Sequence, residues 1–566
     1  MEHQMDSVGG EDRPDDWRVG VSRRAFLGRS LAWGAAGSGA MALSGCGGAD
    51  AGEIDSGLFR HGVASGDPLV DRVIIWTHVT SSTAVDLQWE FALDPVFAKI
   101  ERSGQVSTSL ERDNTAKMDV TGLKSGQTYY YRFRAGAETS DTGRTRTLPQ
   151  GDVSQIRLAV FSCANYQAGY FHAYGDVARR DDVDCAVQLG DYVYETGASG
   201  NESLLAIVLK RDSDPEGEVS TLQGYRSRHA QYRNDASLRA LHASVAMIAV
   251  WDDHDIVNGT WRDGAGDADP IAQGFVARRA AAVQAWREWL PIRETAAGDP
   301  LKIYRSFDFG NLLSLHMLDT RVIGRDQPLT TAQYLAGAGD SPARQLLGAE
   351  QSAWLQAKVQ ASGATWQVLG QQVLMAPMHL PLSIVGDFTQ DKFAEYFDAQ
   401  DTAPAQRSDY QNGLMSQPLV PYNLDAWDGY PAARASVLGM ARALGKNLVV
   451  LAGDTHNAWA SDLLDASGNN VGVEFAGASV SSPGFEASAL RIDSSYLASA
   501  MVRAIPQLRY AQTNRRGYML VSFTPAETRA DWKFISSTLH NSYSIDTQYS
   551  LRTLPGLGQR RLLQSI

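Results

Sequence analysis

Four apolar runs of the chain end abruptly in residues that can hold a metal ion. They occupy residues 156–163, 187–195, 247–255 and 447–457. Short apolar runs of this kind are typical of buried β-strands, and in an open α/β sheet ligands collect at the carboxyl ends of the strands. We therefore expect the four strand ends to converge on one site.

The first part of the chain has a different pattern, in which apolar, aromatic and β-branched residues alternate over short stretches. Residues 73–79, 86–93 and 128–135 show it, with Gly and Ser turns between them. We predict an all-β sandwich, and the turn before residue 128 resembles the corner of fibronectin-like sandwiches, where a Tyr packs over a turn. The aromatic stripe is interpreted as core, with carbohydrate or partner binding as the alternative.

From residue 155 onward, long apolar strands are separated by helical stretches, which is typical of an α/β layer fold. An amphipathic helix is predicted at 275–290, with Trp286 and Trp289 facing the core and Pro291 at its end. Further predicted elements are a helix from 347, a strand at 366–376 and a closing hairpin at 517–524 and 528–536. Two polar stretches, 324–345 and 381–425, are predicted as long loops.

Composition limits the class of protein. The chain has 566 residues, of which 44% are hydrophobic and 20% charged, as in an ordinary globular enzyme. Its net charge of −13 disfavours nucleic-acid binding by a basic face. Attraction for a phosphate group must therefore come from bound cations.

The N-terminus has the features of an export signal. Residues 22–27, SRRAFL, resemble a twin-arginine motif, and the Ala- and Gly-rich run that follows is too short for a membrane span. Residues 43–46 resemble a lipobox in which Cys46 becomes lipidated; the alternative is a plain signal peptide with an incidental Cys. We predict export by the twin-arginine machinery to the periplasm or cell envelope, with a lipid anchor at Cys46.

The other two cysteines are Cys163 and Cys185. An even pair in an exported protein can form a disulfide. However, Cys163 lies at a strand end and Cys185 inside an apolar run, and these different depths argue against a bridge.

The ligand types indicate a mixed metal site. Oxygen donors, which suit hard cations such as calcium, magnesium or manganese, are available from Asp191, Asp253, Asn258 and Asp454. A phenolate and a thiolate favour a more polarising ion such as ferric iron, and these come from Tyr194 and Cys163, while His456 can serve either ion. Asp191 is the best bridging candidate, because it lies between the other ligand groups in the sequence.

Two or more neighbouring cations suit in-line displacement at phosphorus, because they activate a water molecule and neutralise developing charge. His254, beside Asp253, is placed to protonate the leaving oxygen or to bind the phosphoryl group. The alternatives for His254 are a third ligand or a structural hydrogen bond. A calcium-hand loop is rejected, because the acids near residue 253 do not fall at alternate positions.

A family resemblance covers residues 57 to 540. The motifs FSCANY, GDYVYE, WDDHDIVNGTW, LDTR and GDTHN, in this order behind HGVASGDP and VIIWT, resemble the PhoD-like alkaline phosphatase and phosphodiesterase family, which is related to purple acid phosphatases. The resemblance implies a four-layer metallophosphoesterase α/β sandwich preceded by a fibronectin-like β-sandwich. We predict a signal and lipobox at 1–46, the β-sandwich at 57–150, the catalytic domain at 155–540 and a C-terminal tail at 541–566.

The resemblance also implies Fe(3+) and Ca(2+) in the site. The residues that match the iron shell are Cys163, Asp191, Tyr194 and His456. Those that match the calcium shell are Asp191, Asp253, Asn258 and Asp454.

Several positions depart from the family pattern. Asp255 stands where Glu is usual, His78 replaces an Arg, and Gly259 stands where Asp or Asn is frequent, which leaves the number of calcium ions open. The Val-x-x-His motif of metallophosphoesterases is missing, and Gln372 is only a weak substitute. Arg321, in LDTR, either holds a neighbouring loop, which we favour, or reaches a phosphate.

The leading hypothesis is an exported, metal-dependent phosphatase or phosphodiesterase that hydrolyses small phosphate esters with metal-activated water. The alternative is an envelope lipoprotein that binds a phosphorylated or glycan ligand without turnover. The complete ligand set together with His254 favours the enzyme, since a pure binder needs no proton donor beside the metals.

Overall fold

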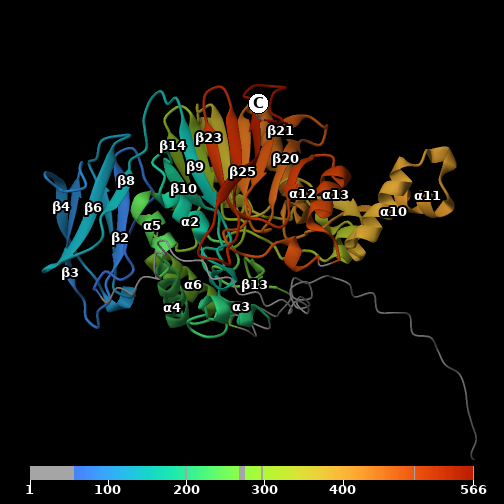
Figure 1. Cartoon of the computed structure of the whole chain (residues 1–566). Helices are drawn as coiled ribbons and strands as arrows, with labels where there is room; N and C mark the ends of the chain where they lie inside the picture. The colour runs from blue at the N-terminus through green and yellow to red at the C-terminus, as the bar shows by residue number, and fades with distance from the viewer. Residues whose placement is uncertain (1–56, 198–200, 267–273, 295–297, 490, 565–566) are drawn as a thin grey trace, which may run out of the picture.

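The computed structural model describes residues 57–197, 201–266, 274–294, 298–489 and 491–564. The twin-arginine motif and Cys46 lie outside the described residues. In Figure 1 a small β-sandwich, coloured blue, stands at one side of a larger α/β body. Within the described part of the chain, no helix is both long and apolar enough to cross a membrane.

The α/β body has two sheets stacked between two layers of helices. The first sheet contains the parallel strands β9 (Ile156–Phe161), β10 (Cys185–Gln188) and β11 (Met247–Ala249), extended by β23 (Arg516–Phe523), β24 (Thr528–Ile535), β25 (Ile545–Thr553) and β26 (Leu563–Gln564). The second has the order β14 (Arg305–Phe309), β15 (Leu313–Met317), β16 (Trp366–Gly370), β19 (Asn447–Ala452), β21 (Asn470–Ala476), β20 (Ala458–Leu464) and β22 (Leu508–Gln512).

Side-chain alternation along the strands builds the layers. In β19, Val449 and Leu451 face the core between the two sheets, while Leu448 and Val450 face helices on the outside. These outer helices are α8 (Gly348–Ala361), α12 (Pro431–Ala443) and α13 (Ser494–Ala504). The first sheet is covered by α2 (His172–Ala178), α4 (Leu222–Arg233), α5 (Ala236–Ser244) and α6 (Phe275–Trp289). The predicted four-layer architecture is confirmed.

The N-terminal sandwich encloses its own aromatic core. Its five-stranded sheet contains β3 (Asp86–Ala92), β4 (Ile100–Ser107), β6 (Thr128–Ala135), β7 (Glu138–Thr139) and β8 (Gly143–Arg146). Phe91, Tyr131 and Phe133 are fully buried, so the aromatic stripe is core as predicted. The Tyr129 hydroxyl accepts the Lys124 N–H at 2.9 Å, which is the expected tyrosine corner.

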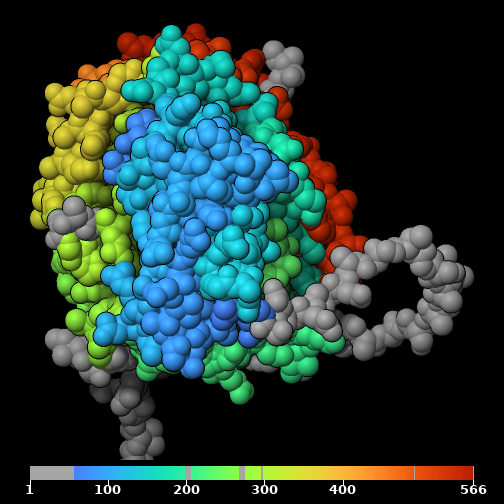
Figure 2. Space-filling model, turned by 90° about the vertical axis from the view of Figure 1, so that its left-hand side faces the viewer, coloured from blue at the N-terminus to red at the C-terminus, as the bar shows by residue number. Residues whose placement is uncertain are grey.

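The sandwich is continuous with the α/β body. Its other strands, β1 (Val63–Gly66), β2 (Arg72–His78) and β5 (Thr115–Thr121), extend the first sheet, because β1 pairs in parallel with β11. The buried Asp67 strengthens this junction: its two oxygens bind Arg305 at 2.6 and 2.9 Å, and one accepts the Arg293 N–H at 2.7 Å. Figure 2 views the molecule from the side of the sandwich, which is coloured blue and lies in front of the α/β body.

Buried histidines lie at the same junction. Nδ1 of His78 is 2.8 Å from Nδ1 of His61, and the His78 ring stacks on Trp289. Burial lowers the pKa of His61 to about 2, of His78 to about 4 and of the neighbouring His229 to about 3. His78, which departs from the family's Arg, is therefore a neutral packing residue.

Other local predictions are confirmed. Helix α6 spans Phe275–Trp289, and both of its tryptophans, Trp286 and Trp289, are 1% exposed. Strands β23 and β24 form the expected antiparallel hairpin. Cys163 and Cys185 are both free thiols.

Three predictions need correction. The supposed tail at 541–566 contains β25 and β26, which pair onto the first sheet, and the strand predicted at 366–376 ends at Gly370. The stretch 381–425 is largely helical, with α9 (Leu382–Gly386), α10 (Gln390–Asp401) and α11 (Asp409–Ser416) between the paired strands β17 (His379–Pro381) and β18 (Leu419–Pro421).

Helices α10 and α11 extend away from the body in Figure 1. Their N-caps explain why a polar stretch is helical. The Thr389 side chain accepts the Lys392 N–H, and Ser408 forms a capping box with Gln411. The remaining α-helices and β-strands in the described part of the chain are α3 (Asn201–Leu209), α7 (Thr331–Leu335), β12 (Thr260–Trp261) and β13 (Gly264–Ala265).

The buried histidines predict a loss of stability in acid. Below about pH 6.5 the histidines bind protons in the unfolded chain but stay neutral in the folded protein. Proton binding therefore favours the unfolded chain, and the free energy of unfolding decreases as the pH falls from about 6.5 toward 4. For His78 alone the loss is about 3 kcal/mol. Urea unfolding between pH 8 and pH 4 measures this loss. In His78→Phe the free energy of unfolding should depend less on pH than in the wild-type protein. The same slope in both proteins would contradict the assignment.

Candidate metal centre

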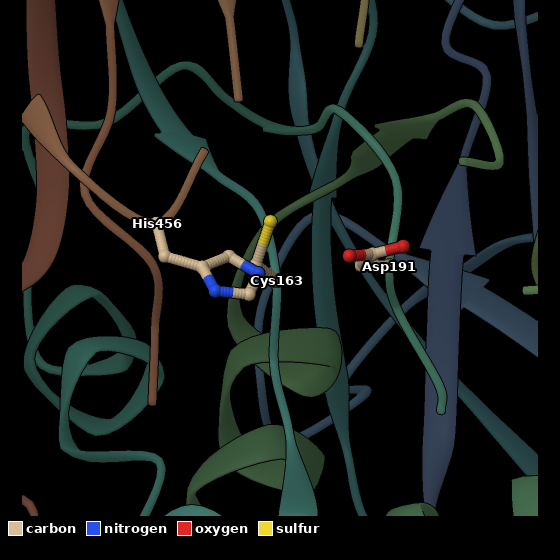
Figure 3. A group of neighbouring side chains, drawn as sticks. All are labelled: Cys163, Asp191 and His456. Atoms are coloured by element: carbon tan, nitrogen blue, oxygen red, sulfur yellow. The ribbon is translucent and has the colours of Figure 1, made fainter. Parts of the chain in front are cut away.

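The carboxyl ends of four strands meet at one point between the two sheets. Strands β9, β10 and β11 are neighbours in the first sheet, and β19 comes from the second. The ligand atoms of Cys163, Asp191 and His456, which follow β9, β10 and β19, all lie within 4.8 Å of one another. Figure 3 shows the thiol, the carboxylate and the imidazole ring gathered there.

The backbone is left-handed at four of the predicted ligands. The φ angles are 59° at Cys163, 51° at Asp191, and 61° at both Asp454 and His456. Non-glycine residues seldom adopt this region. Each such position costs on the order of 1–3 kcal/mol and persists only where the surrounding structure enforces it. Strain of this kind concentrates at functional sites, and here it coincides with the residues singled out by the strand-end pattern.

Two glycines allow the strand ends to approach closely. Gly190, with φ of 112°, has no room for a side chain, because a Cβ there would collide with the Cβ of Asp252. A Cβ on Gly453 would lie 2.6 Å from that of Ser162. A glycine directly before Asp191 and another directly before Asp454 are thus steric requirements of the site.

The first ligand group joins Cys163, Asp191, Tyr194 and His456. The Tyr194 hydroxyl donates to Oδ2 of Asp191 at 2.9 Å and lies 3.2 Å from Nε2 of His456. Nδ1 of His456 donates to the Pro483 carbonyl at 2.8 Å, so Nε2 is left to face the group. A carbonyl on the far nitrogen is the usual support of a metal-binding imidazole.

Two further groups continue from the first. Asp191, Asp253 and His254 form the second, and Asp252, Asp253 and Asp454 form the third. Asp191 therefore belongs to two groups and Asp253 to two, which makes Asp191 the link between the predicted iron and calcium shells. Asn258 lies at the same edge, where its N–H donates to Oε1 of Glu195 at 2.7 Å.

Arg321 is fully buried among carboxylates. It forms ion pairs with Asp252, with Asp425 at 2.6 Å and with Asp454 at 2.7 Å. Its guanidinium donors are thereby committed within the protein. The placement favours the holding role over contact with a phosphate.

Burial of these acidic groups disfavours their charged forms, so that cations would stabilise the site. Burial raises the pKa of Asp191 to about 6 and raises the pKa values of the Asp252 carboxyl, the Cys163 thiol and the Tyr194 hydroxyl well above their usual ranges. A bound cation would offset this penalty by favouring the charged forms. The third group offers only carboxylate oxygens, as hard cations require. The first group adds a thiol, a phenol and an imidazole, which suit a more polarising ion. The residues present therefore fit metal ions of two kinds.

His254 is adjacent to Asp253 and is partly buried, with its side chain 14% exposed. Its ring stacks on Tyr194 at 4.3 Å, and Nδ1 is 2.7 Å from Oε2 of Glu195. Burial alone would lower the pKa of His254, but the carboxylates of Glu195, Asp191 and Asp253 outweigh it and raise the pKa to about 10. Those carboxylates therefore favour the doubly protonated ring.

Sequence reasoning missed Glu195 and Asp252. Both stand inside quoted motifs, GDYVYE and WDDHD, but their neighbours drew attention as ligands. Helix α4 was missed as well: the Tyr232 hydroxyl accepts the N–H of Tyr194 at 3.1 Å, and Arg228 donates to the Tyr194 carbonyl at 2.5 Å. No local pattern marks such supporting residues, since their role depends on which turn packs against the helix.

Comparisons with known proteins agree with this geometry. The family model described as "PhoD-like phosphatase" matches residues 158–532, and "PhoD-like phosphatase, N-terminal domain" matches residues 45–149. The chain is 34% identical over 511 residues to "Alkaline phosphatase D" of Bacillus subtilis (strain 168), covering 87% of this chain and 80% of that protein. It is similar to the solved "Structure of PhoD", with a TM-score of 0.74 and 31% identity over 91% of this chain and 94% of that one. The chain therefore belongs to the PhoD-like phosphatase family and is a phosphoric ester hydrolase.

Proposed function

We propose that the protein is a metal-dependent alkaline phosphatase and phosphodiesterase that hydrolyses small phosphate esters. One observation carries this proposal: three overlapping ligand groups at converging strand ends, joined through Asp191 and Asp253. A shared carboxylate is the arrangement that holds two cations close enough to act on one phosphoryl group.

The metals would be Fe(3+) and Ca(2+). Cys163, Asp191, Tyr194 and His456 would hold the iron, and Asp191, Asp253, Asn258 and Asp454 would hold the calcium. When bound, such ions supply an activated water molecule and neutralise charge on the phosphoryl oxygens. Arg321 keeps Asp252 and Asp454 in place from behind.

His254 would act on the leaving group. Its side chain is 14% exposed and stacks on Tyr194 beside the predicted ligands, so an imidazole N–H there would be available to the ester oxygen. As the bond between phosphorus and that oxygen breaks, the oxygen takes the ring proton and leaves as an alcohol. A charged, doubly protonated ring is suited to this donation.

The same proposal places the enzyme at the cell envelope. The SRRAFL motif supports twin-arginine export, and Cys46 supports a lipid anchor. Twin-arginine export carries folded proteins, which suits an enzyme that must load its metals before crossing.

Loss of a shared ligand should abolish activity. We expect Asp191→Ala and His456→Ala each to lower kcat by more than about 100-fold, because even supporting residues of metal sites cost 10- to 100-fold. Chelation of the wild-type enzyme should do the same. Asp181→Ala, at a side chain 92% exposed, is the control and should keep full activity. Undiminished hydrolysis by either variant would show that the ligands are misassigned.

Iron beside Tyr194 should colour the protein. We expect a visible tyrosinate-to-iron absorption band in the natively exported enzyme, and its loss in Tyr194→Phe, because the phenol oxygen lies within the first ligand group. Absorption spectra with metal analysis test this. A colourless enzyme with full activity would exclude ferric iron bound by Tyr194.

Membrane attachment depends on Cys46 in this proposal. Cys46→Ser should move the exported protein from the membrane to the soluble fraction, because it lacks the thiol that carries the lipid. Cell fractionation with activity assays measures the distribution. Membrane attachment of the variant would contradict the anchor.

A further inference from the structure

We propose that Glu195 is a positioning residue that aims the imidazole of His254 at the leaving oxygen of the ester. This inference rests on the phosphatase function proposed above. It assigns a role to a buried carboxylate that is not one of the proposed metal ligands.

The two oxygens of Glu195 have separate partners. Oε2 lies 2.7 Å from Nδ1 of His254, and Oε1 accepts the N–H of Asn258 at 2.7 Å. A carboxylate oxygen accepts, so Nδ1 must be the donor. Nε2 is then the nitrogen left for the substrate, and among the described residues it has no hydrogen-bond partner.

Further contacts hold His254 from other directions. The Tyr194 ring stacks on the imidazole with centroids 4.3 Å apart and planes 29° from parallel. The backbone N–H of His254 donates to Oδ1 of Asp191 at 3.2 Å. Stacking restrains the tilt of the imidazole ring, but a flip of the ring by about 180° around its Cβ–Cγ bond would keep the stacking intact. Only the hydrogen bond from Nδ1 to Glu195 decides which nitrogen points outward.

The backbone on both sides of Glu195 is clamped. Arg228, which is 1% exposed, donates to the carbonyls of Tyr194 and Thr196 at 2.5 and 2.7 Å. The same guanidinium reaches the carbonyls of Pro215 and Gly217 at 2.9 and 3.1 Å. Because Arg228 binds carbonyls, it leaves the carboxylate of Glu195 for His254 and Asn258. The ionic partner of Glu195 within the described part of the chain is His254.

The chemistry follows from this orientation. When the phosphorus–oxygen bond breaks, its electron pair moves to the leaving oxygen, which takes the proton of Nε2. The oxygen of water forms the new bond to phosphorus and gives up a proton to solvent, and a solvent proton restores the ring. Glu195 retains the hydrogen bond from Nδ1 throughout. An alkoxide needs this proton in order to leave, whereas a nitrophenolate leaves readily without it.

The test is therefore whether the loss of kcat in Glu195→Gln depends on the leaving group of the ester. Gln keeps the size of the side chain but has one acceptor oxygen, so it cannot accept from both His254 and Asn258. For a glycerol phosphate, kcat should fall about 100-fold, as expected for a misplaced general acid. For p-nitrophenyl phosphate, kcat should fall less than about 10-fold. KM, the melting temperature and the metal content should stay at wild-type values.

Two matched variants sharpen the result. Glu218→Gln makes the same chemical change at a side chain that is 47% exposed and paired with Arg278. This variant should keep the wild-type kcat on both esters. His254→Asn should reproduce the leaving-group pattern, and the double variant with Glu195→Gln should lose no more than His254→Asn alone, because the two residues act as one unit.

The outcomes separate the two proposals. If the wild-type enzyme hydrolyses neither ester, the phosphatase function and this inference both fail. Three results with an active wild-type enzyme would overturn the positioning role alone. They are an equal loss of kcat by Glu195→Gln on both esters, a loss of bound metal from this variant, and an unchanged kcat on both esters. A loss confined to the glycerol phosphate establishes it.

Discussion

Carboxylates buried side by side repel one another, and much of this protein serves to hold several of them together. Asp191, Asp252, Asp253 and Asp454 are each at most 2% exposed, and they arrive from the ends of three different strands. The left-handed turns at Asp191 and Asp454 and the glycines before them are needed to bring the acids so close. This crowding is unfavourable in the bare protein, and cations bound among the carboxylates would offset it.

Buried guanidinium groups stabilise the surroundings of the site. Arg321 lies inside the acid cluster and pairs with its carboxylates, while Arg228 binds backbone carbonyls and fixes the turn that carries Tyr194. A guanidinium suits both tasks because its planar, pre-organised donors reach several acceptors at once. One arginine therefore balances charge, and the other sets geometry.

The N-terminal sandwich takes part in the same construction. Strand β1 pairs with β11, whose carboxyl end leads to Asp252 and Asp253, and the buried Asp67 anchors the junction to Arg305. The sandwich is thus an extension of the sheet that carries the site. Phe91, Tyr129, Tyr131 and Phe133 pack into the core of the sandwich, which agrees with the interpretation of the aromatic stripe as core.

The sequence by itself determined the strands that carry the site, the family and most of the residues that gather at the candidate metal centre. Apolar runs ending in Asp, Tyr, Cys and His are local signals, because a strand and the residue that follows it are read from neighbouring positions. It also located helix α6 and the closing hairpin, but it missed the helical character of 381–425 and the strands after residue 541. Only the tertiary structure showed the partners of Glu195, Asp252, Arg228 and Arg321. Each of these acts through partners from distant elements, such as the 133 positions between Arg321 and Asp454, and a charged side chain carries no local mark of the partner that it will meet.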